Sequence, residues 1–378
     1  MKQIDLHSKA ANPEYISWID LMKGSAIIGI VLFHLFQNYP DPSRLVENFA
    51  KIGAQVGFAG VDIFFLIAGF NISYSFLKKG IHEFKFFQFN WSVWLISRCK
   101  RLYPTYLLAC IFVLLTYFVS GYKICNPLSF DFWLSITGWA GYLFQCLNPG
   151  FWFFTVILEA YLITPILFSI SNGRPGKLLT ITLAFAGITK LLCYLLPASS
   201  PAYYFVLQNN FIGSYIGQYG LGLYLGSEYF TSSSRFSKRS IYFSFSLFFL
   251  ALIIYFQLSL AGQDIRYMEG FDLAFTPAFF FIGYYVFEKA FLKVKSLPVF
   301  HAIDVLLRYV GQRSYQVYLV HQPILFVILA PLTRLIGFDN HLETLLVSVL
   351  ALIVIILYVY LFICLEQQLN RLALKKSA

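Results

Sequence analysis

Long apolar runs alternate with short polar or basic segments along the whole chain. Ten of these runs approach the ~20 residues that a helix needs to cross the hydrocarbon core of a bilayer. In lipid, only helices or a closed barrel satisfy the backbone, and barrel strands are shorter and alternate in hydrophobicity. The pattern therefore predicts an all-α, polytopic transmembrane helical bundle. The predicted spans are Ile19–Asn38, Gly57–Leu77, Leu102–Ser120, Phe151–Ile170, Leu178–Leu196, Phe205–Gly226, Ile241–Leu260, Phe271–Phe287, Tyr315–Ile336 and Leu342–Cys364.

The segment Phe130–Leu147 is aromatic and fairly apolar, and an eleventh span is one interpretation of it. We interpret it as an interfacial or re-entrant hairpin, because ten spans give the better distribution of positive charge. With both termini in the cytoplasm, the cytoplasmic segments hold 22 of the 28 Lys and Arg residues. This asymmetry follows the positive-inside rule and predicts an N-in, C-in topology.

The composition agrees with a membrane protein. Of 378 residues, 58% are hydrophobic and 12% charged, and the mean hydropathy is +0.68, whereas a soluble domain carries about 25% charged residues. Basic loops facing anionic lipid account for the net charge of +10, so no nucleic-acid partner is expected. The chain shows no repeat and no separate soluble domain, which indicates one membrane domain over residues 1–378.

Two basic segments rich in aromatic residues, Lys78–Arg101 and Pro298–Arg313, are typical of helices lying in the membrane plane. The six cysteines form no CxxC pair and no metal-ligand spacing, so no metal site is predicted. Cys125 and Cys146 both fall on the predicted outer side and are candidates for a disulfide.

Ionisable side chains inside spans carry the functional signal, because each costs several kcal/mol unless it is paired or lines a wet cavity. Lys23 and His34 are eleven residues apart on the first span, just over three helical turns, so they share a face ~16 Å apart along the axis. Asp62 lies in the second span. A carboxylate bonded to one nitrogen of His34 would leave the other nitrogen free as a base.

Polar residues on three further spans extend this set. Arg98 and Arg101 share a face at the cytoplasmic mouth of the third span, where paired guanidiniums suit a phosphate-bearing ligand. Ordinary positive-inside charge is the alternative interpretation. Ser314, Tyr318 and His321 form one stripe on the ninth span, where a packing stripe would be apolar. The remaining polar inventory is Trp152, Glu159 and Tyr161 in the fourth span and Glu366 at the end of the tenth.

Four of these segments together resemble membrane acyltransferase family 3, whose members modify bacterial surface polysaccharides and some other acceptors. DLMKGSAIIGIVLFHLF is similar to the family's first-span motif, with Lys23 in place of an arginine, and GVDIFFLIAGF is similar to its second-span signature, with Ala68 where serine is common. SRCKRLYP matches the family's paired arginines, and GQRSYQVYLVHQPI is close to its late SYxxYLxH element. The resemblance covers nearly the whole chain.

The resemblance implies transfer of an acyl group, usually acetyl, from cytoplasmic acetyl-CoA as co-substrate to a sugar hydroxyl, in a bacterial inner membrane and with no bound cofactor. It implies that His34 and Asp62 are catalytic and that Lys23, Arg98 and Arg101 bind the acyl-CoA. The candidates for contact with the substrate or the oxyanion are Ser314, Tyr318, His321, Trp152 and Glu159.

Three departures from the family pattern qualify this assignment. Lys23 keeps the charge of the family arginine but contacts phosphate as a point charge rather than a fork. Glu159 comes one residue later than the family's glutamate and is rotated by ~100° on its helix. The appended extracytoplasmic domain of some members is not seen. A transporter or exporter of a glycan or lipid-linked sugar is the alternative function, although no paired broken helices or inverted repeat supports it.

Overall fold

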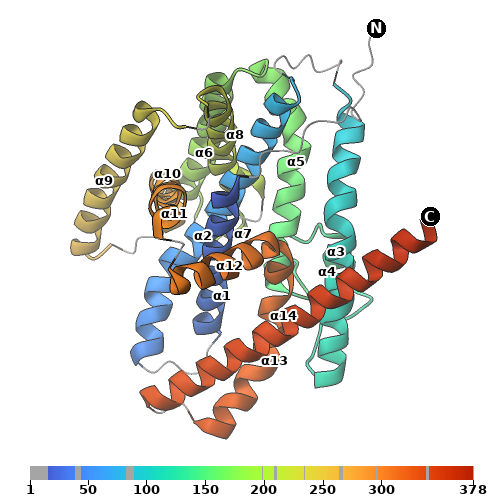
Figure 1. The fold of residues 1–378 in the computed structure, drawn as a ribbon. Helices are drawn as coiled ribbons and strands as arrows, with labels where there is room; N and C mark the ends of the chain where they lie inside the picture. The colour runs from blue at the N-terminus through green and yellow to red at the C-terminus, as the bar shows by residue number, and fades with distance from the viewer. Residues whose placement is uncertain are drawn as a thin grey trace.

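The computed structural model describes residues 16–38, 44–81, 89–197, 199–207, 211–233, 235–263, 267–294, 297–337 and 340–377, without the side chains of 44–58, 204, 292 and 373–377. All regular structure in this part of the chain is helical, which confirms the all-α prediction (Figure 1). The helices are α1 (Ser17–Gln37), α2 (Arg44–Lys78), α3 (Trp91–Ser120), α4 (Phe130–Thr137), η1 (Pro149–Phe151), α5 (Trp152–Ser171), α6 (Pro175–Leu195), α7 (Pro201–Leu207), η2 (Ile212–Ser214), α8 (Ile216–Thr231), α9 (Lys238–Leu260), η3 (Tyr267–Glu269), α10 (Phe271–Tyr284), η4 (Tyr285–Ala290), α11 (Phe291–Val294), α12 (Pro298–Gln312), α13 (Ser314–Ile336) and α14 (His341–Ser377).

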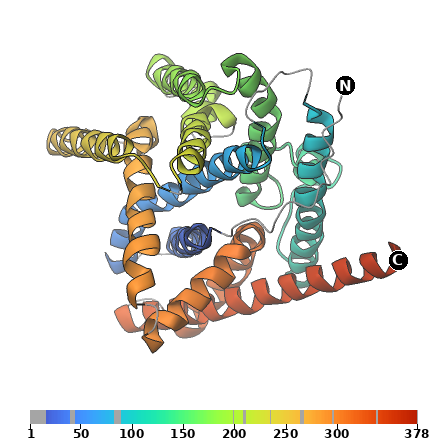
Figure 2. The ribbon, with the colours of Figure 1, turned by 45° about the horizontal axis from the view of Figure 1, so that its top comes forward.

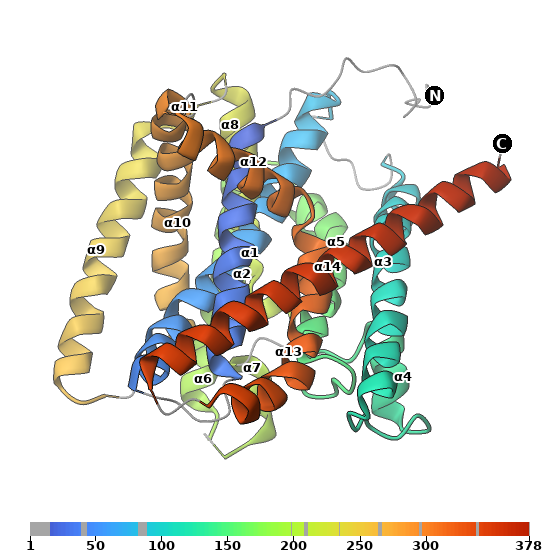
Figure 3. The ribbon, with the colours of Figure 1, turned by 60° about the horizontal axis from the view of Figure 1, so that its bottom comes forward.

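Eight helices among the described residues are long and apolar enough to cross a membrane, and each coincides with a predicted span. They are α1, α2, α3, α5 together with η1, α6, α9, α13 and α14. Helix α1 begins and α14 ends on the same face of the bundle, as an even number of crossings requires (Figure 3). The protein is therefore a multi-pass membrane bundle.

The predicted span Phe205–Gly226 is not one helix, and that prediction is wrong. The range falls on α7, η2 and α8. The carboxylate of Glu159 accepts from the backbone N–H of Ile212 at 2.7 Å, and the hydroxyl of Ser214 donates to the carbonyl of Val206 at 2.9 Å. Irregular backbone at membrane depth is tolerated where side chains satisfy it in this way.

The predicted span Phe271–Phe287 is helical but changes type along its length. Helix α10 covers Phe271–Tyr284, and the π-helical segment η4 then continues into α11. The regular α-helix is therefore shorter than predicted. Such π-helical turns are rare and occur frequently at functional sites.

Helix α1 lies near the centre of the bundle, with α2, α10 and α13 around it (Figure 2). Glycines bring neighbouring helices unusually close. A side chain at Gly222 on α8 would overlap the carbonyl oxygen of Leu66 on α2, and one at Gly311 would overlap that of Asp20 on α1. Small residues at helix crossings are the common means of close packing in membranes. Here they allow α8 to pack closely on α2, and α12 to pack closely on α1.

The two predicted in-plane helices differ in outcome. Helix α12 runs across the N-terminal part of α1, on the face where α14 ends, as the prediction for Pro298–Arg313 required (Figure 3). The segment Lys78–Arg101 lies partly outside the described residues, and from Trp91 onward it forms the first turns of α3. Trp91 and Trp94 are buried and pack against Phe76 and Phe168 rather than facing lipid head groups. A separate interfacial helix over Trp91–Arg101 is therefore wrong.

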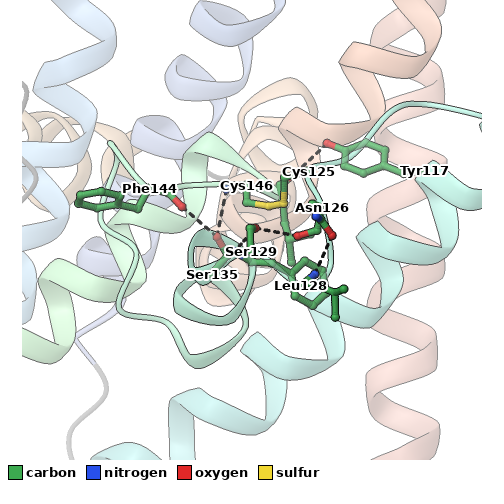
Figure 4. The surroundings of a disulfide bond; sticks show 10 residues. Tyr117, Cys125, Asn126, Leu128, Ser129, Ser135, Phe144 and Cys146 are labelled. Carbon is green, nitrogen blue, oxygen red and sulfur yellow. Dashed lines mark hydrogen bonds between the residues drawn. A yellow bond between two sulfur atoms is a disulfide. The ribbon is translucent and has the colours of Figure 1, made fainter.

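The loop between α3 and α5 contains the short helix α4 and the disulfide Cys125–Cys146, whose Cα atoms are 5.6 Å apart (Figure 4). The side chain of Ser135 accepts from the backbone N–H of Cys146 at 3.0 Å, and the phenol of Tyr117 donates to the carbonyl of Leu147 at 3.0 Å. Both the candidate disulfide and the interpretation of Phe130–Leu147 as something other than a span are confirmed. Asn148 follows this disulfide-closed loop and lies beside α13.

Candidate active site

The first and ninth predicted spans meet through their histidines. Nδ1 of His34, near the end of α1, lies 2.7 Å from Nε2 of His321 on α13, and the two rings stack with centroids 5.0 Å apart. His321 is completely buried, whereas His34 is half-buried. We call these two residues the imidazole pair.

The surroundings of His321 fix the hydrogen positions of the pair. Its Nδ1 lies 2.9 Å from the carbonyl oxygen of Val317 and 3.0 Å from that of Tyr318. Because carbonyls only accept, Nδ1 carries the hydrogen, and in a neutral imidazole Nε2 is then an acceptor. His34 donates from Nδ1 to this acceptor. The lone pair of His34 therefore stands on Nε2, where it is available to a substrate.

The predicted pairing of Asp62 with His34 is wrong. Oδ2 of Asp62 accepts from the phenol of Tyr267 at 2.8 Å and from the hydroxyl of Thr276 at 3.2 Å, while Oδ1 is buried without a hydrogen-bond partner. Burial and the neighbouring Asp62 hold the pKa of Tyr267, in the segment between α9 and α10, well above its usual range, so the phenol remains a donor. Asp62 faces α10, and His321 takes the place that we predicted for it.

The predicted polar stripe on α13 faces the protein interior. Ser314, Tyr318 and His321 are all buried, and the ring of Tyr318 lies 4.7 Å from that of Phe153 on α5 and 5.9 Å from that of His321. Trp152, one residue before Phe153, stacks on Tyr215 at 5.5 Å. The structure thus brings Tyr318 to the imidazole pair, and it places Glu159 at the interruption between α7 and α8 instead.

The three predicted cations lie on two helices. Lys23 on α1 forms an ion pair with Asp20 at 2.6 Å. The guanidinium of Arg98 on α3 lies 5.3 Å from the ring centroid of Trp94 and 5.9 Å from that of Tyr161, with a buried Nε that has no hydrogen-bond partner. Arg101, one turn further along α3, is exposed. No contact among the described residues joins the two helices through these side chains.

Two buried polar residues that we did not predict are Asn148, which follows the loop closed by the disulfide, and Gln322, the residue after His321. Asn148 is completely buried and donates from Nδ2 to the carbonyl of Leu319 at 2.9 Å. Gln322 is buried beside Gly150 and Asn148, and its Oε1 has no hydrogen-bond partner. The sequence signal for Gln322 was its position inside the SYQVYLVHQPI segment. A loop asparagine gives no such signal.

A second buried polar group was also missed. Nζ of Lys190 on α6 donates to Oδ2 of Asp272 on α10 at 2.8 Å and to the carbonyl of Met268 at 2.7 Å, and Nε2 of Gln218 on α8 donates to the same Oδ2 at 2.8 Å. Lys190 and Asp272 are ionisable residues within predicted spans, and the argument applied to His34 and Asp62 applied equally to them.

The remaining carboxylate of the inventory is Glu366 on α14. It accepts from Thr105 on α3 and, at 3.0 Å, from Gln316 on α13. It is buried and joins α14 to α3 and α13. Both of its carboxylate oxygens have partners, which suits a structural role.

Comparison with known proteins identifies the bundle that carries the imidazole pair. A family model described as an acyltransferase domain matches residues 16–361, most of the chain and all the residues discussed above except Glu366. The chain belongs to acyltransferase family 3. No curated protein and no solved structure matches it.

Membership of acyltransferase family 3 makes this chain a membrane acyltransferase. An acyltransferase needs a group that removes a proton from the acceptor or itself accepts the acyl group. Within the described residues, the imidazole pair combines a buried partner with a free lone pair on a half-buried ring. It is the candidate centre of this acyltransferase.

Proposed function

We propose that this acyltransferase moves an acyl group, with acetyl as the first candidate, from cytoplasmic acyl-CoA to a hydroxyl of a cell-surface carbohydrate or its precursor. The proposed setting is a bacterial plasma membrane. The observation that carries the proposal is the imidazole pair, in which His321 accepts from Nδ1 of His34 and leaves Nε2 of His34 as a base or nucleophile. The family's usual chemistry supplies the donor and acceptor classes.

In the base mechanism, Nε2 of His34 removes the proton of the acceptor hydroxyl as its oxygen attacks the thioester carbonyl. The C–S bond then breaks, and the thiolate of CoA takes the proton from His34. In the nucleophilic mechanism, Nε2 attacks the thioester first, the C–S bond breaks, and CoA leaves as the thiolate. The acceptor oxygen then displaces the imidazole from the acyl group, and its hydroxyl proton passes to the CoA thiolate. In both, the hydrogen bond to His321 keeps the reacting nitrogen fixed.

Negative charge develops on the thioester oxygen in either mechanism and needs a donor. Tyr318 is our first candidate, because its ring contacts His321 and Phe153 directly. Ser314, one turn earlier on the same stripe, is the second. The unpartnered Oε1 of Gln322 is suited to accept from a hydroxyl of the acceptor sugar.

The donor part of the proposal rests on positive charge at the predicted cytoplasmic end of α1 and α3. Guanidinium and ammonium groups bind the phosphates of CoA, the former through a fork of two hydrogen bonds. Arg98 presents an unpartnered Nε, and Arg101 is exposed one turn away. Lys23 would exchange part of its interaction with Asp20 for phosphate.

The test is label transfer in reconstituted vesicles. Purified protein receives acetyl-CoA labelled in the acetyl group on the side of the termini, and mass spectrometry follows label into oligosaccharides or lipid-linked sugars. We expect ester-linked acetyl on a sugar hydroxyl with wild-type protein and none with His34→Ala. Label that stays on His34 when acceptor is withheld would select the nucleophilic mechanism. Acetyl transfer at the wild-type rate by His34→Ala would overturn the proposal.

A further inference from the structure

The second buried polar group, which we call the carboxylate cluster, consists of Asp62, Lys190, Tyr215, Gln218 and Asp272. It ties four helices together: α2 supplies Asp62, α6 supplies Lys190, α8 and the residue before it supply Gln218 and Tyr215, and α10 supplies Asp272. All five side chains are buried, with exposed fractions between 0% and 6%. None of them has a role in the mechanism above.

Four oxygen atoms of the carboxylate cluster have no hydrogen-bond partner although they are buried. They are Oδ1 of Asp62, Oδ1 of Asp272, Oε1 of Gln218 and the phenol oxygen of Tyr215. A buried polar atom without a partner costs about 1–3 kcal/mol, and more when it belongs to a charged group. Four together in one cluster indicate a partner that protein atoms do not provide.

The contacts of these residues show that they are neighbours in the bundle. Gln218 donates to Asp272, and Tyr215 lies three residues before Gln218 on the same helical face. The ring of Tyr215 stacks on Phe65 with centroids 4.4 Å apart, and Phe65 lies three residues after Asp62 on one face of α2.

The hydrogen bonds of Asp62 place it beside the same part of α10 that carries Asp272. Its partner Thr276 lies one turn from Asp272 on α10, so Asp62 contacts α10 one helical turn from Asp272. The residues that carry the four unpartnered oxygens therefore lie close together between α2, α8 and α10.

The charges of the carboxylate cluster do not balance. Two carboxylates face one ammonium, that of Lys190, which bonds to Asp272. Asp62 receives only neutral donors, Tyr267 and Thr276. With both carboxylates ionised, the cluster has a net charge of −1 in a bundle where an uncompensated buried charge costs several kcal/mol, and either a bound cation or a proton on Asp62 removes it. One positive charge restores neutrality, and a second would exceed it.

We propose that the carboxylate cluster binds one alkali-metal cation, of the class of Na⁺, through Asp62, Asp272, Gln218 and Tyr215. Carboxylate, amide and phenol oxygens are hard ligands and suit hard cations. The charge of the cluster selects a monovalent ion over Ca²⁺ or Mg²⁺. The imidazole pair belongs to α1 and α13, which supply none of the four ligands.

Thermal unfolding of the purified protein in detergent tests this site. The chloride salt is varied from choline to sodium at constant ionic strength and pH. A cation that binds only the folded state raises Tm in a saturable manner, so we expect Tm to rise with sodium and to level off. Asp62→Asn should abolish the rise. Tyr215→Phe removes one ligand oxygen and should shift the half-saturating sodium concentration upward several-fold.

Glu366→Gln is the matched control, because Glu366 is a buried carboxylate of the same bundle whose two oxygens already have partners. Its sodium-dependent rise in Tm should equal that of the wild type. Retention of radioactive ²²Na⁺ by the wild-type protein, at one ion per chain, provides a second measurement should Asp62→Asn fail to fold. Equal Tm in sodium and choline would overturn the proposal, as would equal stabilisation by Mg²⁺ or a Tm that follows only pH.

Discussion

The imidazole pair and the carboxylate cluster are both polar groups buried in one apolar bundle, but they are satisfied in opposite ways. The imidazole pair joins two helices through one hydrogen bond of 2.7 Å, and the reacting ring is half-buried. The carboxylate cluster joins four helices through an ion pair and several hydrogen bonds, and it is closed to solvent. One group keeps a lone pair available, whereas the other pairs one of its two carboxylates with an ammonium of the protein.

This difference teaches that depth in the membrane does not by itself indicate catalysis. Polar residues in lipid need compensation, and the kind of compensation separates the two roles. A neutral base needs one partner that orients it and one open position. A structural charge needs its opposite charge. Substitutions in the two regions should therefore separate catalytic rate from stability.

The largest effect is expected from His34→Ala. Removal of the base or nucleophile should lower the acyl-transfer rate by about 10³-fold or more. Because His34 is half-buried and makes one side-chain hydrogen bond to the protein, Tm should change little. Label transfer from acyl-CoA and thermal unfolding are measured on the same preparation. A large drop in Tm that accounts for the lost activity would remove the contrast between the two regions.

Lys190→Met should show the reverse behaviour. It leaves Asp272 buried without its ammonium, a change that costs about 3–5 kcal/mol, so Tm should fall by many degrees. The molecules that remain folded should transfer acyl groups at near the wild-type rate. The double substitution Lys190→Met with Asp272→Leu removes both charges and should recover much of the lost Tm. A double variant less stable than Lys190→Met would show that the ion pair is not the stabilising element.

The sequence predicts the helices of this bundle well, because a run of ~20 apolar residues has few alternatives in lipid. Eight spans follow directly from hydropathy. The interruption within Phe205–Gly226 does not, since it depends on the Glu159 carboxylate bonding to a backbone N–H of another segment. A hydropathy average depends only on local composition, so it shows an apolar run here and does not detect such a contact.

The candidate site was predictable in its residues but not in its pairs. His34 and His321 both stand in recognisable segments, yet 287 residues separate them, and their contact depends on which face of α1 packs on α13. Asp62 was the predicted partner because a carboxylate bonded to one nitrogen of His34 would leave the other free as a base. The actual partners of Asp62 are Tyr267 and Thr276, and no local pattern marks them. Which side chains pair with each other depends on how the helices pack.

A smaller effect is expected from His321→Ala, because His321 acts through His34. Loss of the acceptor for Nδ1 of His34 frees the ring to rotate and to adopt the other tautomer, which should lower kcat by about 10²-fold. His321→Gln is the matched variant, since its amide oxygen can accept the same hydrogen bond, and it should retain much of the activity. Equal losses in both variants, together with equal losses in Tm, would indicate that His321 only fills space.

The smallest effect on activity is expected from Arg98, whose assignment to the acyl-CoA site rests on its charge. Arg98 presents its guanidinium between two aromatic rings, with an unpartnered Nε. Arg98→Lys keeps the charge but removes the fork, so KM for acyl-CoA should rise about tenfold while kcat stays within about twofold. Arg334→Lys, at the opposite end of a span, is the control and should leave KM unchanged.

Lys23→Arg on α1 tests the same prediction, that these cations bind the phosphates of CoA. It adds a fork where the family pattern has arginine, and KM should fall rather than rise. If Lys23→Arg alone changed KM and Arg98→Lys did not, the phosphates of CoA would be bound from α1. Arg98 would then be a residue that packs on Trp94 and Tyr161. That outcome would move the donor site toward the crossing of α1 and α12, where Gly24 and Gly311 hold the two helices in contact.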